Sequence, residues 1–145
     1  RVASAIVRYR EESELKTSGD LHKAVERFIP REKEKKFLAK LYQALRIEVN
    51  GELEVLEEML SSAMRVLKPG GRLSVITYHS LEDRLVKNFF KSGNAQGKVE
   101  KDPITGSVNF DFKEVNRKVI IPSDEEIALN PRSRSAKLRI LEKLR

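Results

Sequence analysis

The sequence predicts an α/β fold in which a helical segment precedes a small sheet. Apolar residues recur at helical spacing through residues 1–67, whereas residues 72–78 form a β-branched, apolar run. The breaker Lys68-Pro69-Gly70-Gly71 separates the two patterns. The elements expected after it follow the order of the second half of a doubly wound fold. We therefore expect a helical domain at residues 1–66 and an α/β part at residues 67–145.

Four amphipathic helices are expected in the helical domain, because apolar residues lie three or four positions apart. They are expected over residues 2–12, 19–28, 32–46 and 48–67. Ser18 is the expected N-cap of the second helix, since its hydroxyl can accept an amide hydrogen bond. Gly51 lies near the join of the third and fourth helices, which can therefore form one bent helix.

Three strands of a mixed sheet are expected in the second part, with two helices between them. The strands are expected at residues 72–78, 116–121 and 136–141, and the helices at residues 81–90 and 124–129. The first strand is apolar on both faces, so we expect it to be covered on both sides. Ser80 and Ser123 are the expected helix N-caps. Residues 92–107 are rich in turn-forming residues and predict a flexible loop.

Composition excludes several classes of protein. The 145 residues contain no Cys and only two His, so a disulfide framework and a Cys-ligated metal site are excluded, and no metal site is expected. No 18-residue apolar run is present, so no membrane contact is expected. A cytoplasmic location is expected, because the chain has no disulfides.

The basic charge is unevenly distributed. The net charge is +7, and residues 66–145, with 16 basic and 10 acidic side chains, contribute +6 of it. Such an excess favours a polyanionic partner such as nucleic acid, because cations neutralise phosphates and release counterions. A solvated basic face is the alternative interpretation.

Polar residues follow the first strand, at the edge of an α/β sheet where ligands bind. Here His79 is a candidate proton shuttle or hydrogen-bond donor, and Ser80 and Asp83 are candidate substrate contacts. Ser80 does not lie in a nucleophile elbow, so nucleophilic catalysis is not expected. The alternative is that these residues only start a helix.

Two further polar motifs are candidate RNA-binding sites. The segment NPRSRS places Asn130, Arg132, Ser133 and Arg134 in one turn, where guanidinium and hydroxyl groups can bind phosphates. Its arginines could instead pair with acidic residues elsewhere in the fold. In the segment QALRIEVN, three polar residues share one helix face and either contact a nucleobase or form a solvated face. They are Gln43, Arg46 and Asn50.

A cofactor loop is missing from the sequence. Neither GxGxxG nor GxxxxGK[ST] occurs, and the glycine pair Gly70-Gly71 precedes a strand instead of following one. We therefore assign no cofactor-binding residues to this chain.

Three segments in this order resemble one family. QALRIEVNGELEVLEEML, PGGRLSVITYHSLEDRLVKNFF and NPRSRSAKLRILEK are similar to segments of the bacterial 16S ribosomal RNA cytosine-N4 methyltransferases of the RsmH/MraW family. The resemblance covers essentially the whole chain and is weakest before Tyr42, a position where the family is expected to have Phe.

The resemblance implies a Rossmann-like class I methyltransferase domain interrupted by a helical insertion. It also implies S-adenosyl-L-methionine as cofactor and a cytidine of 16S ribosomal RNA in the small ribosomal subunit as substrate. In the family the glycine-rich loop precedes the insertion, so the chain corresponds to the insertion and the C-terminal part, and we expect it to be inactive alone. A self-standing RNA-binding or interaction module without catalysis is the alternative.

The resemblance also implies that the second and third strands lie on one side of residues 73–78. The other edge of that strand would then be uncovered, and bare β edges promote aggregation. We expect a homodimer through this edge, and the missing N-terminal half is the alternative partner.

Overall fold

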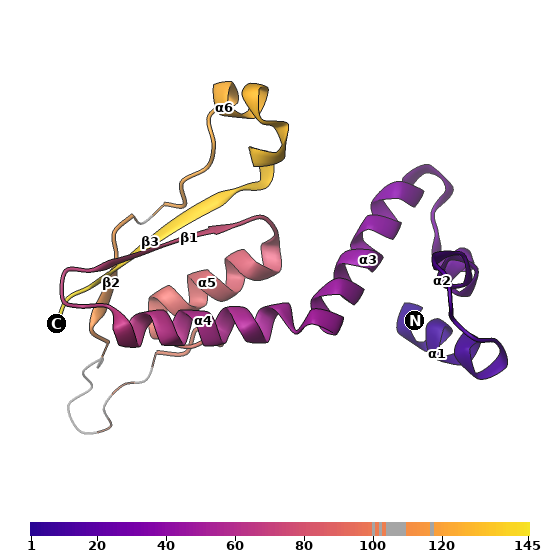
Figure 1. The fold of residues 1–145 in the computed structure, drawn as a ribbon, viewed down its shortest axis with the longest axis horizontal. Coiled ribbons are helices and arrows are strands. Elements are labelled where there is room, and N and C mark those ends of the chain that lie inside the picture. The colour runs from indigo at the N-terminus through magenta and orange to yellow at the C-terminus, as the bar shows by residue number, and fades with distance from the viewer. Residues whose placement is uncertain (100, 102, 104–109, 117) are drawn as a thin grey trace. The chain divides into compact units, whose positions relative to one another are not determined.

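The computed structural model describes residues 1–99, 101, 103, 110–116 and 118–145 (Figure 1). The chain divides into two compact units, Arg1–Asn50 and Gly51–Arg145. The fourth helix therefore belongs with the α/β part. The domain boundary expected near residue 66 stays a prediction, because contacts do not test which residues form an insertion.

The N-terminal unit is entirely helical. It contains three α-helices and two short 3₁₀ turns: α1 (Val2–Glu12), α2 (Ser18–Val25), η1 (Glu26–Phe28), η2 (Arg31–Lys33) and α3 (Glu34–Asn50). The N-cap of α2 is Thr17, so the prediction of Ser18 was wrong by one residue. Thr17 accepts a hydrogen bond from the Asp20 amide, and the Asp20 carboxylate accepts one from the Thr17 amide. This reciprocal arrangement satisfies two amides that a helix start leaves free.

The C-terminal unit alternates helices and strands. Its elements are α4 (Glu52–Val66), β1 (Arg72–Thr77), α5 (Ser80–Ser92), β2 (Phe112–Glu114), α6 (Asp124–Leu129), η3 (Pro131–Ser135) and β3 (Lys137–Lys143). Ser123 caps α6 as expected, by accepting a hydrogen bond from the Glu126 amide. Gly51 has a φ of 57°, a left-handed conformation that interrupts helical hydrogen bonding. Consequently α3 and α4 are two helices and not one bent helix.

The three strands pair in the order β1-β3-β2, and both pairings are antiparallel. The expectation of a mixed sheet was therefore wrong for the described strands. The expectation that two strands lie on one side of β1 is confirmed, although the second strand is Phe112–Glu114 instead of residues 116–121. Within that predicted range, Ile120 forms only an isolated bridge with Leu138.

The hydrophobic core lies between the sheet and the helices α4 and α5 (Figure 1). Its buried residues come from α4, β1, α5 and β3 and are Leu60, Val75, Val86, Phe89, Phe90 and Leu141. Only one face of β1 is covered in the described structure, since Ile76 on the other face is 56% exposed. The prediction that both faces are covered was therefore wrong for this chain.

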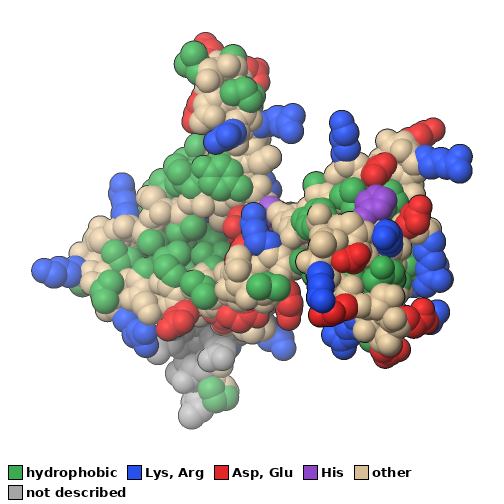
Figure 2. All heavy atoms as spheres, turned by 45° about the vertical axis from the view of Figure 1, so that its right-hand side comes forward, with side chains coloured by type: hydrophobic (Ala, Val, Ile, Leu, Met, Phe, Trp, Pro, Cys, Tyr) green, Lys and Arg blue, Asp and Glu red, His purple; other side chains and the backbone are tan. Residues whose placement is uncertain are grey.

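The uncovered face of the sheet is apolar near Ile76 and polar near Arg72, which forms an ion pair with Glu142. Ile76 lies there beside Ile120 and Leu138, and together with neighbouring residues they line a shallow cavity that extends to α6. In Figure 2, hydrophobic side chains are exposed on the larger unit next to the projecting α6 segment. This face requires a covering layer that the described residues do not provide.

The segment after α5 agrees with a loop as far as it is described. Gly93 ends α5 with a φ of 76°, and residues 93–99 contain no helix or strand. Residues 100, 102 and 104–107 of the expected flexible loop lie outside the described residues, and its flexibility stays a prediction.

Candidate functional site

The sheet register brings two of the predicted motifs to the same end of the C-terminal unit. Thr77, the last residue of β1, pairs with Lys137, the first residue of β3. The connection from β1 to α5 and the η3 turn that precedes β3 therefore lie at the same end of the sheet. Sequence reasoning placed candidate residues in both segments.

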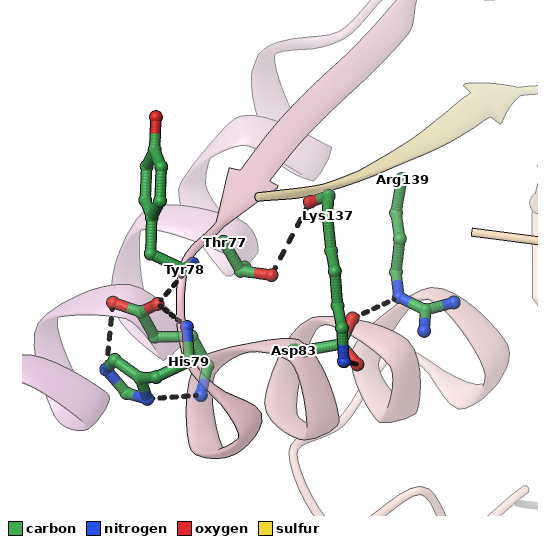
Figure 3. Close-up of polar contacts among 7 residues, drawn as sticks. Thr77, Tyr78, His79, Asp83, Lys137 and Arg139 are labelled. Carbon is green, nitrogen blue, oxygen red and sulfur yellow. Dashed lines mark hydrogen bonds and ion pairs between the residues drawn. The ribbon is translucent and has the colours of Figure 1, made fainter. Parts of the chain in front are cut away.

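His79 is the N-cap of α5, so the prediction of Ser80 as the cap was wrong. His79 Nδ1 accepts a hydrogen bond from the Glu82 amide at 3.4 Å, and Glu82 Oε2 accepts hydrogen bonds from the amides of Tyr78 and His79 (Figure 3). Because Nδ1 is an acceptor, the neutral ring carries its proton on Nε2. That nitrogen lies 3.1 Å from Glu82 Oε1 but is not aligned for a hydrogen bond.

The capping contacts limit what the imidazole can do. The His79 side chain is only 13% exposed, and both ring nitrogens face Glu82. Ser80 is exposed at the first position of α5. The geometry therefore makes His79 an organiser of the strand-to-helix connection, while Ser80 faces solvent.

Asp83 forms an ion-pair cluster with the start of β3. Its two carboxylate oxygens accept hydrogen bonds from Arg139 Nε at 2.8 Å and from Lys137 Nζ at 3.1 Å (Figure 3). Burial by itself would raise the pKa of Asp83, but the hydrogen bonds and charges of Arg139 and Lys137 outweigh it and hold the pKa below its usual value. In this structure Asp83 joins α5 to β3.

The η3 turn is fixed by its own polar residues. The Asn130 side chain accepts a hydrogen bond from the Arg132 amide, and the Ser133 hydroxyl donates to the Asn130 carbonyl at 2.8 Å. Ser133 is buried, whereas Arg132 and Arg134 are exposed. Within the described part of the chain, neither arginine forms an ion pair. The turn thus presents two unpaired guanidinium groups on an ordered backbone.

The third motif belongs to the other unit. Gln43, Arg46 and Asn50 all lie on α3. Gln43 and Arg46 line a shallow groove on this helix, and Arg46 and Asn50 each have interaction partners. The two units are described separately, so the structure does not join this motif to the strand end.

Sequence reasoning missed three residues that organise the strand end. Lys137 and Arg139 are two residues apart in β3 and therefore lie on the same face of the strand. This spacing shows that they are neighbours but does not identify Asp83 as their partner. Glu82 stands three residues after His79, as in a capping box, but His is an unusual N-cap. The three-residue spacing of His79 and Glu82 was the sequence signal that could have identified this capping box.

The described residues contain no group of three or more His, Cys, Asp or Glu side chains able to hold a metal ion. In the same part of the chain, no helix has the length and apolar character needed to cross a bilayer. Within these residues, the connection between β1 and α5 does not have the form of an adenosylmethionine site. The connection between β1 and α5 is closed by Glu82 and His79 and offers no glycine-rich cradle.

Comparison with known proteins identifies the family. A model of the MraW methylase family matches residues 1–144. The chain belongs to this family. As a member of the MraW methylase family it is related to methyltransferases, and this membership supports a methyltransferase fold for its mixed α/β structure.

The chain is similar to curated members of the MraW methylase family over almost its whole length. It is 59% identical over 144 residues to the ribosomal RNA small subunit methyltransferase H of Parabacteroides distasonis, and 58% identical over 143 residues to that of Phocaeicola vulgatus. It is 57% identical to the protein of that name from Bacteroides thetaiotaomicron. Each match covers 99% of the chain and 47% of the relative, so the chain spans about half the length of these proteins.

Proposed function

We propose that the chain is part of an S-adenosyl-L-methionine-dependent methyltransferase that methylates N4 of a cytidine in 16S ribosomal RNA. The observation that carries the proposal is the family match over residues 1–144, together with relatives named for a small-subunit ribosomal RNA methyltransferase. The N4 position, the 16S RNA and the cofactor follow from the resemblance of the three sequence motifs.

This chain contributes RNA contacts and a shaped strand end to the proposed reaction. Arg132 and Arg134 are exposed and unpaired in the described structure, which suits bidentate contacts with phosphates. Ser80 and the connection held by His79 face the same end of the sheet, where we propose that the cytidine lies. Methyl transfer depends largely on positioning the amine, so a preorganised contact surface is the chain's main contribution.

The cofactor supplies an activated methyl group when it is bound. The β1–α5 connection is closed by Glu82 and His79, and the sequence has no glycine-rich cofactor loop. We therefore propose that the cofactor site lies in the part of the longer protein that this chain does not contain. The chain alone is then inactive. Calorimetry of the isolated chain with S-adenosylmethionine is expected to show no binding, and stoichiometric binding of about −8 kcal/mol, the value for micromolar affinity, would contradict this map.

The free edge and uncovered face of β1 are proposed contacts for that remaining part. Among the described residues no strand pairs with the second edge of β1, and Ile76 on the uncovered face is exposed. A second copy of the chain is the other occupant we predicted. Sedimentation equilibrium of the 145-residue chain and of the longer protein decides between them. Dimers of both at micromolar concentration support the second copy. A longer protein that stays monomeric supports the remaining part as the occupant.

The main test is methyl transfer by the longer protein. Small ribosomal subunits incubated with the protein and labelled S-adenosylmethionine are expected to gain one methyl group on a cytidine, mapped by mass spectrometry of nuclease digests. Methylation of another base or of protein would overturn the proposal.

The arginine turn gives a sharper test of RNA contact. Replacing Arg132 and Arg134 with Ala is expected to lower the log–log salt slope of RNA binding by about one to two, because each phosphate contact counts for nearly one. The matched control is Lys87→Ala with Lys91→Ala, which removes the same charge from α5. His79→Ala is expected to lower methylation by the longer protein while leaving RNA affinity nearly unchanged.

A self-standing RNA-binding module is the second candidate function. It is favoured by the net charge of +6 in residues 66–145 and by the unpaired arginines. Salt-dependent RNA binding by a longer protein that transfers no methyl group would select this candidate.

A further inference from the structure

The α3 face that carries Gln43 and Arg46 is also cationic. The run from Lys35 to Arg46, KKFLAKLYQALR, contains four basic residues and no acidic residue. A shallow groove lies on one face of this helix. It is lined by Lys36, Ala39, Lys40, Tyr42, Gln43 and Arg46.

The shape of this groove follows from its sequence. Ala39 is small and lies one helical turn from both Lys36 and Tyr42, so the longer side chains form the rim around it. The apolar residues of the same helix, which include Phe37, Leu41 and Leu45, lie on the opposite side and are partly buried. The groove is therefore the solvent-facing side of an amphipathic helix.

The lysines of the groove have no acidic partner. In the part of the chain that the structure describes, neither Lys36 nor Lys40 lies within ion-pair distance of a carboxylate. Glu34, the acidic residue of the first turn, lies 3.2 Å from His22 instead. Figure 2 shows that the N-terminal unit also carries acidic side chains, so the absence of acid along this run is a local feature.

An aromatic ring and an amide complete the set. Tyr42 is 41% exposed, which is high for a large aromatic side chain in a helix with an apolar face. Gln43 adds a donor and an acceptor beside it. Unpaired cations interleaved with an exposed aromatic ring match the two needs of a single nucleic-acid strand, which are phosphate neutralisation and base stacking.

We propose that the Lys36–Arg46 groove binds a single-stranded segment of the RNA substrate. Lys36 and Lys40 contact phosphates, and Tyr42 stacks on a base. This deepens the proposed function and rests on it for the identity of the RNA. Lys36 and Arg46 are ten residues apart, about 15 Å along the helix, so the groove accommodates only a few nucleotides.

An acidic polypeptide is the competing partner for a cationic helix face. The exposed Tyr42 ring favours RNA, because stacking on a base uses the whole ring whereas a carboxylate does not need it. Duplex RNA is disfavoured, because its bases are already stacked and not open to Tyr42.

The experiment measures binding of the 145-residue chain and of the longer protein to three fluorescent probes. They are a short cytidine-containing single-stranded RNA, the same RNA annealed to its complement, and poly-glutamate. We expect the single strand to bind most tightly. Lys36→Ala with Lys40→Ala is expected to lower the log–log salt slope by about 1.4, since each single-strand phosphate contact counts for about 0.7.

The tyrosine is tested by a conservative pair of variants. Tyr42→Ala is expected to weaken single-strand binding about tenfold with an unchanged salt slope, and Tyr42→Phe is expected to retain the affinity, because a phenyl ring stacks equally well. Lys87→Ala with Lys91→Ala is the charge-matched control for the lysine pair and is expected to leave the salt slope unchanged.

Three outcomes would overturn the groove assignment. They are an unchanged slope in the lysine variant, equal affinity of Tyr42→Ala and wild type, and binding of poly-glutamate with the same dependence on Tyr42. Methylation assays on the longer protein separate this failure from that of the proposed function. Loss of the groove effects with methylation intact contradicts only the groove, whereas absence of methylation in the wild type contradicts the proposed function.

Discussion

The two units of the chain differ in how much apolar volume they bury. In the C-terminal unit Leu60, Leu141 and Phe90 are at most 1% exposed and pack in one cluster. In the N-terminal unit the buried apolar residues are mostly small, and Val25 is the only one without exposure among its described residues. Burial of apolar area is the main source of folding stability, so most of the chain's folding stability comes from the C-terminal unit.

The unit with the smaller core is the one that carries the cationic groove. The N-terminal unit has 50 residues, a size at which a single core is marginal. Its α3 presents the cationic groove, and the C-terminal unit presents the exposed arginines of η3 beside a larger core. We therefore expect core substitutions to lower the free energy of unfolding more in the C-terminal unit than in the N-terminal unit. We also expect each substitution to accelerate amide hydrogen exchange only in its own unit.

The largest effect is expected for Phe90→Ala. Truncating this buried ring leaves a cavity in the C-terminal core, and the free energy of unfolding is expected to fall by about 3–5 kcal/mol. Urea denaturation followed by circular dichroism measures the loss. Val66→Ala, at a side chain that is 80% exposed, is the control and should change stability by at most about 0.5 kcal/mol. Similar losses for both variants would contradict the assigned core.

The second effect concerns the Asp83 cluster. Asp83→Asn leaves Lys137 and Arg139 without their carboxylate, and we expect a loss of about 3 kcal/mol at neutral pH. Denaturation measured against pH also tests the cluster. Because its pKa is lowered in the folded state, the contribution of Asp83 is present above the usual value of 3.8 and is lost as the pH falls through the folded value.

Wild type is therefore expected to lose stability in acid more steeply than Asp83→Asn. The exposed residue Glu125 provides the control, and Glu125→Gln should keep the wild-type pH dependence. Parallel pH curves for wild type and Asp83→Asn would show that the cluster does not stabilise the fold.

A smaller effect is expected for Val25→Ala in the N-terminal unit. Removing two buried methyl groups should cost about 2 kcal/mol. Amide hydrogen exchange is expected to accelerate in α1 and α2 while α5 keeps its protection. Val7→Ala, at a side chain 40% exposed, should produce a smaller change. Equal acceleration in α5 would mean that the two units unfold together.

The smallest effect distinguishes two adjacent residues. Thr17→Ala removes the N-cap of α2 and should cost about 1 kcal/mol, whereas Ser18→Ala should change stability by no more than a few tenths. Thermal denaturation of both variants checks the difference. A larger loss for Ser18→Ala would restore the cap expected from the sequence.

The sequence predicted elements that depend on local patterns. The helices and β1 were found near their expected positions, because apolar periodicity and the breaker at Lys68–Gly71 act over a few residues. β2 was missed because its three residues are selected by pairing with β3, about 30 residues further along the chain. The exposed face of Ile76 was also missed, since strand composition indicates that a cover is needed but not whether this chain contains it.

The candidate site shows the same limit. The strand end and the arginine turn could be identified as motifs, but the partners of Asp83 lie 54 and 56 residues away and only the folded chain shows them. His79 lies at the strand end as the sequence predicted, but its capping role was missed because His is rarely an N-cap. Chemical type is readable from sequence, whereas pairing depends on tertiary structure.

The order β1-β3-β2 places the last strand along the chain in the middle of the sheet. Among the described strands β1 and β2 do not pair with each other, so each gains β3 as its neighbour only after residues 137–143 have left the ribosome. During synthesis more than 40 residues of chain, from Ser92 to Lys137, separate the end of α5 from the strand that pairs with this edge of β1. The edge of β1 that β3 covers is therefore completed late in translation, and we expect this interval to be the one in which the nascent chain is most prone to aggregate.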